Sequence, residues 1–284
     1  MANRYFVGGG TGNWNSTTNW STTDGGASGA SFPIAGDNVF LTAASGVNTL
    51  TINATSACLT LNCTGFTGTL AGSSQLTVSG SVTFVAAMTL TATGLLIIND
   101  TATLTWGGKT WGGAMNLNAG GFTYTISGDC YVTGNVQVGN SGSTTNNLNG
   151  DKLYVGGNLN SVGTGPIFTG TTEIVLNGTG TWSTVYLRNA ITINTTGTIT
   201  LGTLVVYSSS INTLKHVAGT VVTTSSTLRI NSGTPSIDMA SITFNNFEIS
   251  NGATVTLLSD LNISGTLNIG VSVGSTSSVI INGF

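Results

Sequence analysis

The chain has 284 residues and a formal net charge of −3, and charged residues make up only 5% of it. Its six Lys and Arg residues are scattered, and no apolar stretch approaches the roughly 18 residues of a membrane span, so the composition argues against a nucleic-acid partner and against membrane insertion. Gly, Thr, Ser and Asn dominate while strong helix formers are scarce, which argues against long helices and favours a folded, all-β chain.

Bulky and rigid residues gather in the opening segment. Residues 12–41 hold two of the five tryptophans and one of the three prolines. The first strands of a stacked β-structure leave an unpaired edge and an apolar end, which natural proteins cover to prevent edge-to-edge aggregation. We therefore expect residues 1–41 to form an N-terminal cap that folds back over this end. The expected members of the cap are Trp14, Trp20, Phe32, Pro33 and Asp37.

The chain beyond this segment alternates apolar residues with small polar residues. Alternation with a period of two predicts short, half-buried strands. Examples are the pairs Leu50 and Ile52, Leu59 and Leu61, Leu76 and Val78, Val82 and Phe84, Ile191 and Ile193, and Leu261 and Ile263. The three cysteines, Cys58, Cys63 and Cys130, are too few and too unevenly spaced for a disulfide framework. We expect them to be small buried apolar residues.

A second aromatic cluster lies in TWGGKTWGG, residues 105–113. If Trp106 and Trp111 are exposed, their flat faces provide a platform on which sugar rings stack, and the glycines let a ligand approach. Alternatively, one or both rings fill the core at a corner of the fold or cover an insertion. We favour the buried alternative and keep Trp106 and Trp111 as glycan-binding candidates.

A regular spacing appears in the middle of the chain. The phrases GDCYVTG, GDKLYVG and TTEIVLNG place Asp129, Asp151 and Glu173 at equal intervals. The same interval separates Gly112, Gly134, Gly156 and Gly178. A unit of about 22 residues with short strands and no helix is typical of one coil of a parallel β-helix, in which successive coils stack at about 4.8 Å. We therefore expect residues 42–284 to form a parallel β-helix domain, a rod roughly 50 Å long.

The acids of this repeat are the best candidates for a metal site. If Asp129, Asp151 and Glu173 stack, they form a ladder of carboxylates that could bind Ca²⁺ or another hard cation. The alternative, which we favour, is three solvated turn residues, with Lys152 reducing their repulsion. No other cofactor is expected. The acidic residues never lie closer than ten positions apart and His216 is the only histidine, so we do not expect an enzyme.

Two segments resemble known proteins. The string YFVGGGTGNWNSTTNWS followed by FPIAGDNVFL resembles the start of many β-helical proteins from bacteriophages and bacterial surfaces. Residues 244–270, FNNFEISNGATVTLLSDLNISGTLNIG, resemble the coil repeats of the same proteins. The resemblance implies a right-handed, single-stranded parallel β-helix with an N-terminal cap. It also implies a structural protein of a virion or a cell surface.

Three functions are compatible with these observations. The leading expectation is a non-catalytic component of a phage virion, such as a capsid decoration protein, a fibre or a tail appendage. Its partners would be other virion proteins of the capsid or tail and further copies of itself, commonly as a homotrimer. The first alternative is a bacterial surface adhesin or an extracellular filament subunit. The second is a spike module that binds or cleaves a cell-surface glycan.

Overall fold

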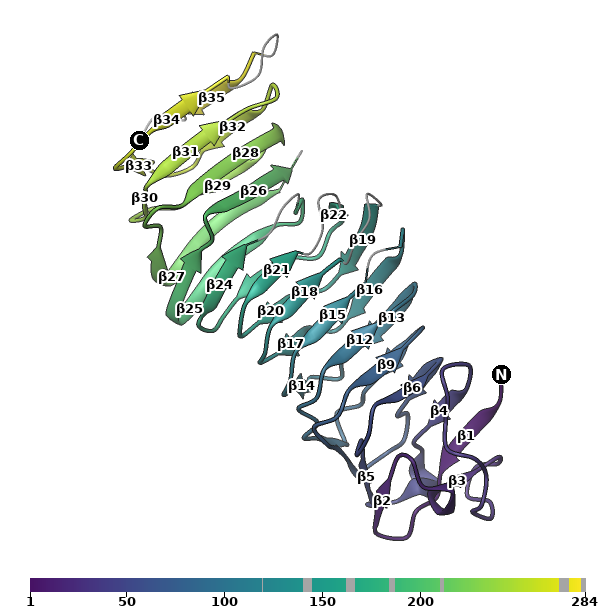
Figure 1. Cartoon of the computed structure of the whole chain (residues 1–284). Coiled ribbons are helices and arrows are strands. Elements are labelled where there is room, and N and C mark those ends of the chain that lie inside the picture. The colour runs from purple at the N-terminus through teal and green to yellow at the C-terminus, as the bar shows by residue number, and fades with distance from the viewer. Residues whose placement is uncertain are drawn as a thin grey trace.

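The chain folds into a parallel β-solenoid of about ten turns, whose strands stack turn upon turn along one axis (Figure 1). This computed structural model describes residues 1–118, 120–139, 145–161, 167–183, 187–209, 212–270 and 276–281. Helix in these ranges is limited to two 3-10 turns, η1 at Thr17–Asn19 and η2 at Ala43–Ser45. The predicted fold class, all-β with parallel coils of about 22 residues, is confirmed.

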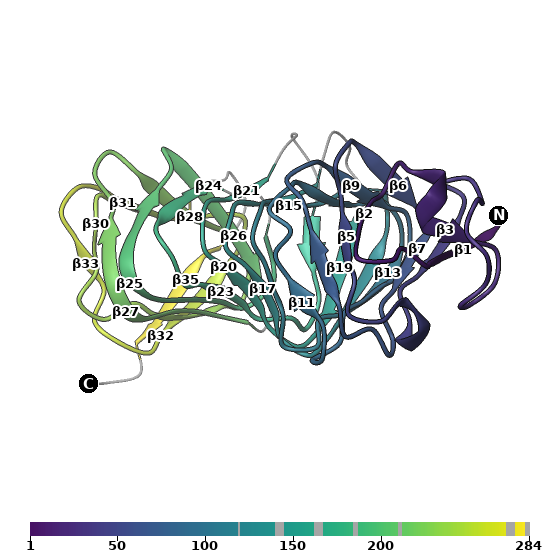
Figure 2. The ribbon, with the colours of Figure 1, turned by 90° about the horizontal axis from the view of Figure 1, so that it is seen from below.

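Parallel sheets form the walls of the N-terminal part of the solenoid, and their turns wrap around a common interior (Figure 2). The first sheet contains β1 (Asn3–Phe6), β4 (Asn38–Phe40), β7 (Thr60–Asn62), β10 (Val82–Thr83), β13 (Ala102–Thr105), β16 (Thr123–Ser127), β19 (Thr145–Gly150) and β22 (Ile167–Thr169). The second sheet contains β2 (Thr11–Asn13), β5 (Thr49–Thr51), β8 (Thr69–Ala71) and β11 (Thr89–Leu90). A short strand, β3 (Trp20–Ser21), pairs antiparallel with the outer edge of β1.

The third sheet extends over most of the rod and consists of two rows of strands that merge at the long strand β25 (Ile191–Leu201). One row contains β6 (Ser56–Cys58), β9 (Leu76–Val78), β12 (Leu96–Ile98), β15 (Met115–Leu117), β18 (Val136–Val138), β21 (Leu159–Ser161) and β24 (Gly180–Ser183). The other row contains β14 (Thr110–Trp111), β17 (Cys130–Val132), β20 (Leu153–Val155) and β23 (Ile174–Leu176). Beyond β25 the sheet continues through β27 (Thr213–Val222), β29 (Ser236–Asp238), β32 (Thr254–Leu257) and β35 (Ser278–Ile281).

Two smaller sheets complete the C-terminal part. One contains β26 (Leu204–Ser209), β28 (Thr227–Gly233), β31 (Asn246–Ile249) and β34 (Leu267–Ile269). The other contains β30 (Thr243–Phe244) and β33 (Asn262–Ile263). The first and the last strands of the chain therefore lie at opposite ends of the rod (Figure 1).

The core is built from rows of inward-facing residues that repeat once per turn. One such row is Leu76, Leu96, Met115, Val136 and Leu159, which are paired in register and fully buried. The three cysteines also face this interior and are buried, as predicted.

The length of a turn varies along the rod, as the strand register shows. Val82 pairs with Leu104, Thr123 with Asn147, and Thr227 with Asn246. The second of these pairs spans the longest stretch of chain and the third spans the shortest. Extra residues of the longer turns therefore lie in the loops between strands, since the strands themselves remain in register.

A ladder of glycines runs along one corner of the solenoid. A Cβ atom on Gly94 would collide with the Ser74 carbonyl oxygen of the preceding turn, and the following glycines are similarly close to the backbone before them. The ladder contains Gly94, Gly113, Gly134, Gly157 and Gly180. These positions accept only glycine because the backbones of successive turns approach too closely for a side chain.

The solenoid begins earlier than the sequence analysis predicted. Strand β1 already pairs in parallel with β4, and β2 pairs in parallel with β5. Residues 3–13 therefore form the first turn, so the boundary predicted at residue 41 lies beyond the start of the solenoid. Only the loop from Trp14 to Asp37, including β3, lies over its end.

Candidate functional site

An aromatic cluster, which we call the N-terminal plug, closes the first turn of the solenoid. It consists of Phe6, Trp14, Trp20 and Phe66, whose side chains are all buried. The rings of Trp14 and Trp20 pack edge to face with centroids 5.4 Å apart, and Phe6 lies 6.0 Å from Trp20. Trp20 Nε1 donates a hydrogen bond of 2.7 Å to the Trp14 carbonyl oxygen. The structure thus places both tryptophans over the apolar end of the rod.

The remaining predicted cap residues have different roles. Asp37 is buried and its Oδ1 accepts a 2.9 Å hydrogen bond from the Ala2 backbone N–H, while Arg4 Nη2 lies 3.9 Å from its Oδ2. Asp37 therefore ties the start of β1 to the second turn. Pro33 is buried. Phe32 is 41% exposed and, unlike the residues of the plug, does not belong to the buried core cluster.

Trp106 and Trp111, the glycan-binding candidates, are both fully buried, which agrees with the favoured alternative that their rings fill the core and excludes the platform for sugar rings. The Phe84 ring packs against both indoles, at centroid distances of 5.1 Å from Trp106 and 6.2 Å from Trp111. Each indole N–H also has an internal partner: Trp111 Nε1 donates to the Gly94 carbonyl oxygen at 2.8 Å and Trp106 Nε1 to the Tyr131 carbonyl oxygen at 3.2 Å. No face of either ring is available to a sugar.

An aromatic pair that the sequence analysis missed lies on the outer face of the third sheet. Tyr131 and Tyr154 occupy equivalent positions in β17 and β20, and their rings stack with centroids 4.5 Å apart. Both side chains are partly exposed. The signal was present in GDCYVTG and GDKLYVG, where each Tyr follows an inward-facing residue and must therefore point outward. A hollow of about 290 Å³ beside Tyr131 is bordered by Thr110 and Asn177.

The three acids considered for a carboxylate ladder do not lie in one row. The strand register aligns Asp129 with Lys152 and Lys152 with Glu173, so a cation lies between two of the three acids. Lys152 Nζ forms an ion pair of 3.0 Å with Glu173 Oε2. Asp151 belongs to the neighbouring row, where its Oδ2 accepts a 2.7 Å hydrogen bond from the Gly128 backbone N–H.

The structure therefore does not bring Asp129, Asp151 and Glu173 together as a Ca²⁺ site. It agrees with the favoured alternative, in which Lys152 reduces the repulsion between the acids. Over the part of the chain that the structure describes, no group of three His, Cys, Asp or Glu side chains could hold a metal ion.

The Glu173 carboxylate interacts with several polar and charged side chains of this row. Partial burial on its own would raise the pKa of the Glu173 carboxyl, but hydrogen bonds from Thr192 and Lys152 and the charges of Lys152 and Lys215 together lower the pKa below its ordinary value of 4.5. The same pairing, led by the hydrogen bond to Glu173, raises the pKa of Lys152. Both groups are therefore charged throughout the neutral pH range.

A polar hollow of about 410 Å³ lies next to this row on the same face. Its border includes Glu173, Thr192, Asn212, Lys215 and Asp238. Lys215 Nζ lies 3.9 Å from Asp238 Oδ2, which is a loose and largely solvated ion pair. Hydroxyl-rich ligands match this mixture of donors and acceptors.

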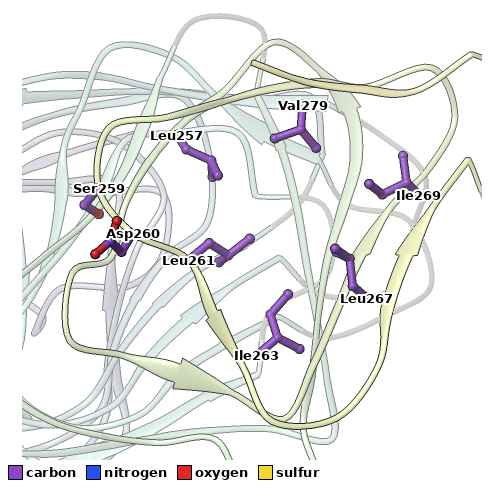
Figure 3. A pocket seen from close by; sticks show the side chains of 8 residues that line it. All are labelled: Leu257, Ser259, Asp260, Leu261, Ile263, Leu267, Ile269 and Val279. Atoms are coloured by element: carbon purple, nitrogen blue, oxygen red, sulfur yellow. The ribbon is translucent and has the colours of Figure 1, made fainter. Parts of the chain in front are cut away.

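The C-terminal end of the rod carries an apolar hollow of about 370 Å³ (Figure 3). Its lining comes from three sheets and the segment before β33, and Figure 3 shows the aliphatic side chains of Leu261, Ile263, Leu267, Ile269 and Val279 around a common space. The lining residues are Leu257, Ser259, Asp260, Leu261, Ile263, Leu267, Ile269 and Val279. Among the described residues, aromatic rings therefore fill the first end of the solenoid, whereas mostly aliphatic side chains line the hollow at the other end.

No protein-family model, no curated protein and no solved structure matches this chain. Within the described ranges, no helix has the length and apolar character needed to cross a bilayer. The assignment of a role therefore depends on the geometry of the molecule itself.

Proposed function

We propose that this protein is a non-catalytic structural component of a bacteriophage virion, a rod-shaped capsid decoration protein, fibre or tail appendage. The resemblance of the opening segment to phage β-helical proteins supports the proposal. So does the scarcity of charged residues, because hydroxyl and amide contacts between neutral groups are less sensitive to salt than ion pairs.

The observation that carries the proposal is an outer surface that is hydrogen-bonded to itself. Polar side chains bond to their counterparts one turn away, at donor–acceptor distances between 2.6 and 2.9 Å. Examples are Asn53 to Asn15, Thr60 to Asn38, Asn118 to Asn99, Ser183 to Asn160, and Asn251 to Asn231. Contacts of this kind tie each turn to the next outside the core as well as inside it, which suits a stiff and durable rod.

Co-sedimentation with phage particles tests this role. Particles purified by density-gradient centrifugation from an infected or induced culture are analysed for the chain by quantitative mass spectrometry. We expect the chain in the particle fraction at a constant ratio to the major capsid protein. Its consistent absence from particles would overturn the proposal. Labelling of intact uninfected cells by antibody would then favour the alternative role as a surface adhesin or filament subunit.

A glycan-binding role is the second candidate, and a separate observation favours it. The stacked Tyr131 and Tyr154 rings and the polar hollow at Glu173, Lys215 and Asp238 lie on one outer face of the third sheet. Partly exposed aromatic rings beside hydrogen-bonding side chains are the usual elements of a sugar site. We expect a glycan array probed with wild type and with Tyr131→Ala/Tyr154→Ala to report binding that the double variant loses. Binding that the double variant retains would place any glycan site elsewhere.

A further inference from the structure

One outward-facing row of the third sheet carries an aromatic ring in two successive turns and a short side chain in the turn before them. The register pairs Thr110 of β14 with Tyr131 of β17, and Tyr131 with Tyr154 of β20. These three strands follow one another along one side of the rod (Figure 1). Thr110 is exposed. On its N-terminal side, the aromatic part of the row therefore ends at Tyr131.

The two rings are nearly parallel, so one face of each ring is covered by the other. Their centroids are 4.5 Å apart and their planes differ by 14°. This distance is close to the spacing of about 4.8 Å between neighbouring strands, so the ring faces are directed along the rod. The second face of Tyr154 is directed toward Val175, which is only 3% exposed although it lies in the same outward row. The second face of Tyr131 is directed toward Thr110, whose side chain is too short to cover a phenol ring.

A hollow of about 290 Å³ borders both Tyr131 and Thr110. Its lining residues are Thr110, Tyr131, Val132, Thr133, Gly156 and Asn177. All of them, and the residues on either side of each, belong to the described structure. A Cβ atom on Gly156 would lie 2.6 Å from the Thr133 carbonyl oxygen, so this position does not accept a side chain. The gap between Thr133 and Asn177 is therefore fixed by the packing of the backbone.

The hollow has hydrogen-bonding groups that the protein does not use itself. Elsewhere on the outer surface, many amides and hydroxyls bond to counterparts one turn away. The side chains of Thr110 and Asn177, in contrast, form no hydrogen bond within the described part of the chain. Thr133 Oγ1 donates to the Gly112 carbonyl oxygen at 2.8 Å, which leaves its lone pairs free to accept. Donors and acceptors for a ligand are thus present on several sides of the Tyr131 ring.

The charge and the size of the hollow limit the class of ligand. None of its lining residues is charged. The carboxylate that contacts the Tyr131 ring is Asp129, whose Oδ2 accepts a 3.3 Å hydrogen bond from Tyr131 Oη, and its negative charge disfavours an anionic ligand. A volume of about 290 Å³ lies just below the range of roughly 300 to 1,000 Å³ that is typical of small-molecule sites. One neutral ring with an apolar face and a polar edge matches these limits, and a pyranose has this form.

We propose that this hollow binds one neutral pyranose unit of a glycan, whose C–H face stacks on the free face of Tyr131. The hydroxyls of the sugar bond to Thr110, Thr133 and Asn177. The ligand ring then takes the place that a third aromatic side chain would have in the row. The inference rests on the glycan-binding role and names the part of the surface and the class of sugar that it involves. Because a single ring makes few contacts, we expect dissociation constants on the order of millimolar for isolated sugars.

Saturation-transfer NMR of the full chain with methyl glycosides tests the site. The neutral probes are the methyl glycosides of glucose, galactose, mannose and N-acetylglucosamine, and methyl glucuronide is the anionic probe. We expect a saturable signal from at least one neutral probe. Thr110→Tyr should abolish it, because the new ring occupies the place of the ligand while the other lining groups remain. Thr103→Tyr, at an exposed outward threonine of β13, is the matched control and should bind like wild type. Unchanged thermal unfolding establishes that Thr110→Tyr is folded.

A second variant and the glycan array separate this inference from the glycan-binding role. Asn177→Ala should weaken binding about fivefold through the loss of one hydrogen bond. Array binding that Tyr131→Ala/Tyr154→Ala loses but that both Thr110→Tyr and Asn177→Ala retain would overturn this site and leave the role intact. A glucuronide that binds more tightly than every neutral probe would overturn the class of sugar. The lack of a saturable signal from every neutral probe up to about 50 mM would overturn the inference as well, and an array that also shows no binding would overturn the role with it.

Discussion

Lys152 lies one turn before Glu173 on the outer face of the third sheet, with its Nζ 3.0 Å from the carboxylate of Glu173. Both side chains are partly exposed to solvent, so the pair contributes at most about 1 kcal/mol to the free energy of unfolding. Its significance is structural, because it places a cation in the row of Asp129 and Glu173, in agreement with the expectation that Lys152 reduces the repulsion between the acids.

This pair predicts a defined pH dependence of stability. The pKa of Glu173 is lowered in the folded protein, so its contribution is fully present above its ordinary pKa of 4.5 and is lost as the pH falls through the lower folded pKa. The melting temperature of Glu173→Gln should therefore lie slightly below that of wild type at neutral pH. The two should converge in acid, below the folded pKa. A difference that is constant from neutral to strongly acidic pH would contradict the assigned ion pair.

The two tryptophans of the N-terminal plug should respond differently to the same substitution. Trp20 Nε1 donates to the Trp14 carbonyl oxygen, whereas Trp14 Nε1 has no partner among the described residues. Both changes to Phe remove apolar volume, but only Trp20→Phe leaves a buried carbonyl oxygen without this donor. We expect Trp20→Phe to lower the free energy of unfolding, measured in urea, by about 1 kcal/mol more than Trp14→Phe. The reverse order would contradict the arrangement of the plug.

The glycine ladder predicts a site where one methyl group is not tolerated. A Cβ atom on Gly94 collides with the backbone of the preceding turn, while one on Gly9 has no atom within 4 Å. Gly94→Ala should destabilise the protein by about 1 to 3 kcal/mol or prevent folding, because a rigid backbone has to move. Gly9→Ala should leave the unfolding curve nearly unchanged. Equal stability of the two variants would mean that successive turns are not packed this closely.

The cysteines should be unreactive in the native protein. Burial is the main cause that raises the pKa of the Cys58, Cys63 and Cys130 thiols, which keeps them protonated at neutral pH. We expect a disulfide reagent that releases a coloured thiolate to detect none of the three before unfolding and all three in guanidinium. Rapid reaction of any thiol without denaturant would show that its turn opens or that the residue faces solvent.

The sequence was sufficient for the fold class because alternation and repeat length are properties of the chain alone. The sequence was not sufficient to predict which residues of successive turns lie side by side. The number of residues in a turn changes along the rod, so residues spaced at a constant interval of 22 do not stay aligned from turn to turn. Asp129 therefore aligns with Lys152 and not with Asp151. The same change in turn length hid the glycine ladder, in which Gly134 aligns with Gly157 and not with Gly156.

The direction of the aromatic side chains needed the structure as well. Alternation identifies which residues of a strand share a face. Trp106 directly follows β13 and Trp111 ends β14, so both lie next to loops, where alternation does not predict the direction of a side chain. Tyr131 and Tyr154 lie inside regular strands, so their outward direction could have been predicted. The exposure of Leu267 and Ile269, 48% and 49%, could not have been predicted, because both residues have the same sequence pattern as buried core residues.

Amide hydrogen exchange followed by mass spectrometry is the most direct test of a parallel β-solenoid whose first turn is closed by the N-terminal plug. The account predicts slow exchange in β1, at residues 3–6, because β1 pairs with β3 on one side and with β4 on the other. It predicts faster exchange in β34, at residues 267–269, which pairs only with β31 among the described strands. Exchange in β1 as fast as in β34 would contradict the account.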